Sequence, residues 1–166
     1  MLGHGHSLGF ASLVISWHVL AMFVPSFFSG ALIERFGLAR IVTAGLTLMV
    51  LSSIVAVIGT ERVHFALALI GNGLGWNFLF VSGSALLAGG NDPDERASLQ
   101  GSNEFLTCAA QAVATFAAGA LYPCYGWGVL NAVGIALIGL AKPSAVPLQR
   151  GLGVKDDDPR AQRSVR

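Results

Sequence analysis

Polar side chains interrupt several long apolar runs of this sequence, and they are its first candidates for chemistry. His18 follows Trp17 in the first run, Asn77 lies in the third, and Gln111 lies in the fourth. If these runs cross a membrane, polar groups in them are costly and commonly face a cavity or another helix. The four residues are therefore candidates for a substrate path. Imidazole gains and loses a proton near neutral pH, so His18 is the best candidate for a solute or proton contact.

Each candidate also has a packing interpretation. His18 could hydrogen-bond a hydroxyl or carbonyl group of a neighbouring helix. Asn77 follows Trp76 and the glycine-rich string 71–75, whose glycines permit close helix packing or a bend. For Asn77 a position on a cavity and a position between packed helices both stay open.

Glu104 is a further charged candidate, near the start of the fourth run. It lies seven residues before Gln111, about two turns of an α-helix, so the two share one face. A carboxylate there could take part in proton coupling. It is also the residue type that the first turn of a helix favours, and we prefer that structural interpretation.

The sequence does not predict an enzyme. The serines of residues 82–85, SGSA, could be paired with His18 or His64 as a base, but no oxyanion hole or matched dyad is recognisable. The glycine-rich string 71–75 lies inside an apolar run rather than between a strand and a helix, so it predicts no dinucleotide cofactor.

Metal and nucleic-acid sites are not predicted either. His4 and His6 are two imidazoles without a third ligand, which makes a weak metal site. The net charge is only +1, so the basic residues do not form a nucleic-acid surface.

The elements that must position these residues are membrane helices. Hydrophobic residues make up 54% of the chain and charged residues 11%, with a mean hydropathy of +0.66. A helix of about 20 apolar residues crosses about 30 Å of hydrocarbon, so the fold class is an all-α, polytopic transmembrane protein. The predicted spans are residues 8–33, 41–59, 63–87, 103–121 and 127–141, followed by a disordered cytoplasmic tail at 142–166.

The positions of lysine and arginine predict the orientation. Of the ten basic residues, only Arg62 follows an even-numbered span; the other nine fall on the opposite side. Because basic residues favour the cytoplasmic side, the N-terminus should lie outside the plasma membrane and the C-terminus in the cytoplasm.

A short charged turn at 30–40, reading GALIERFGLAR, joins the first two predicted spans. Gly30 permits close helix approach, and Gly37 suits a turn with positive φ. Glu34 and Arg35 offer a charge pair at the membrane boundary that could lock or release neighbouring helices.

The turn resembles the loop signature of the major facilitator superfamily. The matching residues are Gly30, Leu32, Glu34, Arg35, Gly37 and Arg40. Glu34 stands where the signature has aspartate, and Leu38 and Ala39 stand where basic residues are common, which resembles the copy in the second half of these transporters. The loop 91–103 resembles their connection between helices ten and eleven. The resemblance therefore aligns the five spans with helices eight to twelve.

The resemblance implies secondary transport of an unidentified small solute, driven by protons or by the solute gradient, with no cofactor. It also suggests a gate in which Arg35 pairs with Asp92, Glu95 or Glu104. Two interpretations stay open. The chain is part of a transporter whose other helices come from elsewhere, as on a partner chain, or it is a truncated, transport-inactive membrane protein that at most packs against a partner.

Overall fold

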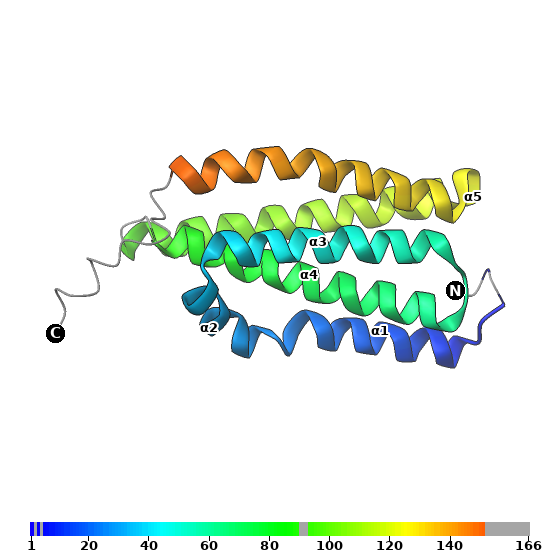
Figure 1. The fold of residues 1–166 in the computed structure, drawn as a ribbon. Helices are drawn as coiled ribbons and strands as arrows, with labels where there is room; N and C mark the ends of the chain where they lie inside the picture. Colours follow the sequence, from blue (N-terminus) through cyan, green and yellow to red (C-terminus); the bar gives the residue numbers. More distant parts are fainter. Residues whose placement is uncertain (2, 4, 90–92, 152–166) are drawn as a thin grey trace.

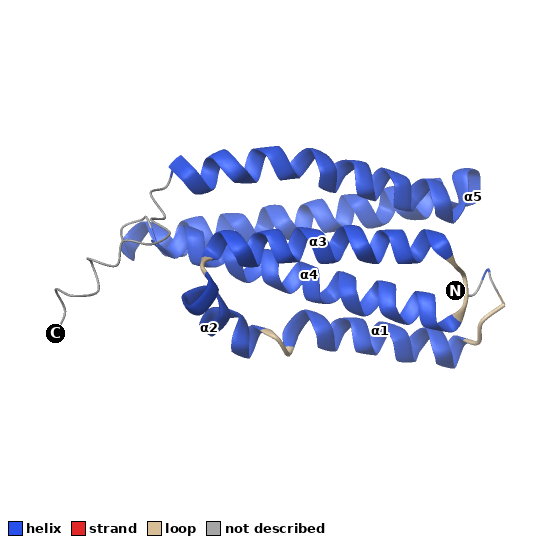
Figure 2. Ribbon diagram, in the orientation of Figure 1, coloured by secondary structure: helices blue, strands red, loops and turns tan. Residues whose placement is uncertain are grey.

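The computed structural model describes residues 1, 3, 5–89 and 93–151. These residues form helices and contain no strand, which confirms the predicted all-α fold (Figures 1 and 2). The helices are α1 (Leu8–Phe23), α2 (Ser26–Phe36), α3 (Leu38–Ile58), α4 (Arg62–Gly89) and α5 (Pro93–Gly151).

The long helices run side by side, and α5 folds back on itself at Gly126 (Figure 1). Gly126 has a φ of 72°, a conformation that glycine adopts readily and other residues rarely. The reversal divides α5 into a first arm, residues 93–125, and a second arm, residues 127–151. Below, the Arg35 end is the end of the bundle with the α2–α3 turn, and the Arg62 end is the end with the α3–α4 turn.

Length and composition suit these helices to a membrane. Within the described residues, three helical stretches are long and apolar enough to cross one: Leu38–Ile58, Arg62–Ala88 and Glu95–Leu140, the last of which contains the reversal at Gly126. α1 and α2 together form a fourth candidate, bent by 44°. Large apolar side chains such as Phe105 and Phe116 are 72% and 81% exposed, as expected for surfaces that face lipid. The chain is therefore a multi-pass membrane protein.

The predicted span 8–33 is divided at Pro25. The α1 backbone ends with the Val24 N–H bonded to the Leu20 carbonyl, and α2 starts at Ser26. Proline lacks an N–H group and its ring crowds the preceding turn, so the helix bends there.

The helical backbone also extends beyond Ala141, where we expected the tail to begin. α5 continues to Gly151, so the prolines at 143 and 147, which each remove one backbone donor, do not end it. The remainder of the predicted tail, 152–166, lies outside the described residues.

Glycines let α4 lie close to two neighbours at once. A Cβ atom on Gly75 would lie 2.8 Å from the Gly45 carbonyl oxygen of α3. A Cβ atom on Gly73 would lie 2.7 Å from the His18 carbonyl oxygen of α1. Both distances are too short for a real side chain, so the glycine-rich string of α4 serves helix packing.

Candidate functional site

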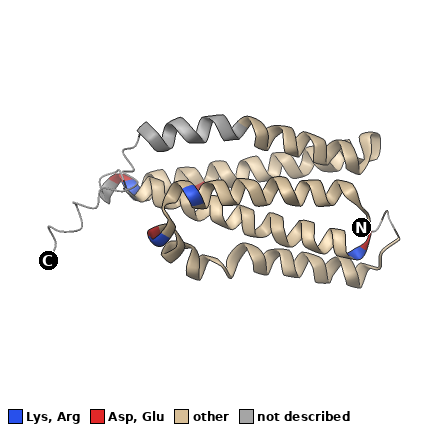
Figure 3. Ribbon diagram, in the orientation of Figure 1, with Lys and Arg blue, Asp and Glu red and all other residues tan. Residues whose placement is uncertain are grey.

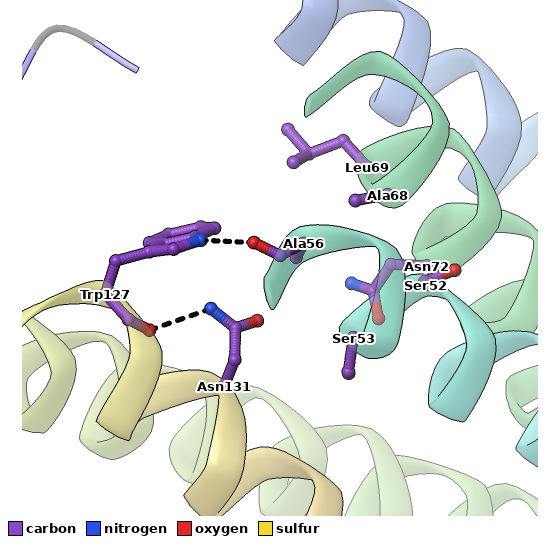
Figure 4. Close-up of a pocket in the computed structure, with 8 residues that line it drawn as sticks. All are labelled: Ser52, Ser53, Ala56, Ala68, Leu69, Asn72, Trp127 and Asn131. Carbon is purple, nitrogen blue, oxygen red and sulfur yellow. Dashed lines mark hydrogen bonds between the residues drawn. The ribbon is translucent and has the colours of Figure 1, made fainter. Parts of the chain in front are cut away.

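A pocket of about 170 Å³ lies between α3, α4 and the second arm of α5, toward the Arg62 end (Figure 4). Its lining residues are Ser52, Ser53, Ala56, Ala68, Leu69, Asn72, Trp127 and Asn131. None of them carries a formal charge. The pocket therefore offers hydrogen bonds from uncharged groups beside an aromatic and aliphatic wall.

Trp127 closes the pocket on the α5 side. It follows the reversal at Gly126, and its Nε1–H donates to the Ala56 carbonyl at 2.7 Å. Ala56 is in the last turn of α3, where carbonyl groups have no partner within the helix. The indole also meets the Phe65 ring edge to face, with centroids 5.7 Å apart. These contacts hold the start of the second arm against α3 and α4.

Several polar groups of the pocket have no partner in the described part of the chain. Ser52 is 6% exposed and, like the Asn72 amide, makes no hydrogen bond there. Asn131 donates from Nδ2 to the Trp127 carbonyl at 2.9 Å, which leaves its Oδ1 facing the pocket (Figure 4). Polar groups at membrane depth are costly without partners, so this arrangement suits water or an uncharged hydrogen-bonding ligand.

The four predicted path residues lie in different environments. His18 is half-buried between α1 and α4, and its Nδ1–H donates to the Leu69 carbonyl at 2.6 Å. The bond matches the packing interpretation of this histidine. Trp17 is 54% exposed on α1, and Gln111 is exposed on the first arm of α5. None of the four lines the pocket.

Asn77 is fully buried, with 0% of its surface exposed. Its amide bonds Met22 of α1 and Ser26 and Ser29 of α2. The geometry therefore matches the packing interpretation and leaves Asn77 no open surface on a cavity. The sequence analysis did not identify Ser26 and Ser29 as partners of Asn77. Their position just after Pro25 in an apolar run could have indicated a polar contact at a helix break.

The predicted gate residues of the α2–α3 turn are exposed or half-buried. Gly37 has a φ of 84°, in line with the expected turn. No atom lies within 4 Å of a Cβ built on Gly30, so the described part of this chain makes no close approach there. The Arg35 guanidinium lies over the Phe36 ring, 5.4 Å from its centroid. Arg40 donates to the Phe36 carbonyl at 3.4 Å.

The charged residues gather toward the ends of the bundle (Figure 3). Arg35 forms no ion pair with Glu95 or Glu104 among the residues that the structure describes, and Asp92 lies outside them. Glu104 accepts a hydrogen bond from Gln100 at 3.2 Å. Pairing across this end stays a hypothesis for another conformation.

Comparisons with known proteins identify transporters that are similar to this chain. The riboflavin transporter RfnT of Brucella anthropi is 47% identical over 131 residues, which cover 79% of this chain and 33% of that protein. Two uncharacterized MFS-type transporters of Bacillus subtilis also match. YddS is 30% identical over 145 residues, covering 86% of this chain and 33% of YddS. YdeG is 37% identical over 108 residues, covering 64% of this chain and 25% of YdeG.

The chain thus spans about a third or less of the length of these relatives. No solved structure matches it. The family model of the Major Facilitator Superfamily matches residues 1–160, nearly the whole chain. With its apolar helices and the charged turn between α2 and α3, this chain belongs to the major facilitator superfamily.

Proposed function

We propose that this chain forms part of a secondary transporter that moves a small solute across a membrane by alternating access. The observation that carries the proposal is the family match over residues 1–160. Solute sites of such transporters lie between two repeats that move against each other. Because the matched segments cover a third or less of the relatives, the chain would supply one wall of a path. The remaining segments would come from the same polypeptide or from a partner chain.

The uncharged lining of the pocket favours an uncharged solute with several hydrogen-bonding groups. Riboflavin is the first solute to test, since a relative with 47% identity is a riboflavin transporter. The path would also include His18, whose half-buried imidazole lies beside α4.

The test is a chimera in which this chain replaces the matched third of RfnT. We expect bacteria that lack their own riboflavin uptake to accumulate labelled riboflavin when they make the chimera. The control is the same RfnT with its matched third deleted. A chimera that reaches the membrane in normal amounts and moves no riboflavin would contradict the proposal.

The chain expressed alone should give no uptake above the empty vector, because one wall cannot enclose a solute. The same uptake assay checks this expectation. Uptake by the chain alone would instead require several copies to associate and complete the path. In that case the uptake should appear together with an oligomer that forms with increasing concentration.

A further inference from the structure

The break between α1 and α2 leaves backbone groups that need partners. α1 ends at Phe23 and α2 begins at Ser26, with Pro25 between them and a bend of 44°. Proline donates no hydrogen bond, and the last carbonyl groups of α1 have no donor within the helix. In lipid such groups cannot turn to water, so a partner must come from a neighbouring helix.

Asn77 of α4 supplies that partner. Its Nδ2 donates to the Met22 carbonyl of α1 at 2.7 Å and to Ser26 Oγ of α2 at 2.5 Å. Its Oδ1 accepts from Ser29 Oγ at 2.6 Å. The Met22 carbonyl can only accept, which fixes the amide nitrogen on that side. One amide thus bonds both sides of the break.

This polar contact is the fully buried part of the α2 packing, because Leu32 and Ile33 of the same helix are only half-buried. Ser29 is the buried residue of α2, with 0% exposure, and its hydroxyl also contacts the Pro25 carbonyl at 2.9 Å. Phe27 and Phe28 on the same helix are 86% and 64% exposed. Hydrogen bonds in a low-dielectric interior are strong, and an unpaired group there is costly. The angle of α2 therefore depends on the Asn77 amide.

We propose that Asn77 is a positioning residue: it pins the bend between α1 and α2 and so sets where α2 carries Glu34 and Arg35. Those two residues occupy the last turn of α2, which leads directly to Gly37 and α3. A change in the hydrogen bonds of Asn77 would move this charged turn while α1 keeps its packing on α4.

The test measures two distances in the purified chain by electron paramagnetic resonance. Cys108 and Cys124 are replaced by serine, and spin labels are attached at Phe28→Cys and Ala85→Cys to report α2 against α4. A second pair, Val19→Cys and Leu67→Cys, reports α1 against α4. All four label sites are exposed. We expect Asn77→Leu to shift and broaden the α2–α4 distances and to leave the α1–α4 distances as they are.

Asn72→Leu is the matched control, because Asn72 is also an asparagine of α4 but bonds neither α1 nor α2. Unchanged α2–α4 distances in Asn77→Leu would overturn the proposal. Equal broadening of both pairs would also overturn it, since that result indicates general loosening. If Asn77→Leu does not fold, Ser29→Ala carries the test, with a smaller shift expected in the same label pair.

Discussion

Gly73 and Gly75 are two residues apart on α4, yet they face different helices. Gly73 meets the backbone of α1 at His18, and Gly75 meets the backbone of α3 at Gly45. Neither glycine can therefore gain a side chain without moving a neighbouring helix. Gly83, further along the same helix, has no atom within 4 Å of a Cβ position and provides a contrast.

Gly75→Ala should destabilise the protein, and Gly83→Ala should not. The new Cβ at position 75 would overlap the Gly45 carbonyl, and overpacking of this kind costs about 1–3 kcal/mol. At position 83 alanine is a better helix former than glycine by about 1 kcal/mol, so stability should rise slightly. Thermal unfolding midpoints measured in detergent test both the decrease expected for Gly75→Ala and the increase expected for Gly83→Ala. Equal effects at the two positions would contradict the packing role of the string.

Arg35 lies on Phe36 in this conformation rather than in an ion pair with Glu95 or Glu104. If it pairs across this end in another conformation, Arg35→Ala should lower riboflavin uptake by the chimera with RfnT without lowering its amount in the membrane. Arg62→Ala, at the opposite end of the bundle, is the control. Uptake that is unaffected by Arg35→Ala would contradict the gate in which Arg35 pairs with an acidic residue.

The second arm of α5 depends on Trp127. Trp127→Phe removes the donor to the Ala56 carbonyl but keeps a ring beside Phe65. We expect the free energy of unfolding to fall by about 1 kcal/mol, because one buried carbonyl loses its partner. Amide hydrogens along the second arm should also exchange faster. Trp17→Phe, at a site 54% exposed on α1, should change neither quantity.

Apolar length and charge placement predicted the all-α membrane fold and the turn at Gly37, because both are local properties. The break at Pro25 was not predicted, since membrane helices often tolerate proline when neighbours bond the freed groups. That rescue is long-range, because Met22 and Asn77 are 55 residues apart. The contact beside the pocket is longer still, with 71 residues between Ala56 and Trp127. No periodicity in the sequence encodes such pairs, and so the pocket beside Trp127 was missed as well.

The distribution of charge over the bundle predicts how it lies in a membrane. A cysteine at Thr60, near the Arg62 end, should react with a membrane-impermeant maleimide added to intact cells. A cysteine at Ala97, near the start of α5 and the opposite end, should react only after the cells are permeabilised. Both tests use the chain with Cys108 and Cys124 replaced by serine. The reverse labelling pattern would contradict the predicted orientation.

The Trp127 contact also fixes one end of the second arm of α5. The indole holds this arm at the Arg62 end, and the helix then extends over residues 127–151, about 36 Å at 1.5 Å per residue. A tilt of the arm by about 10° around the Trp127 contact would move its far end by roughly 6 Å, about one helical turn. Small changes at the Trp127 contact would therefore give larger displacements at the far end of the arm.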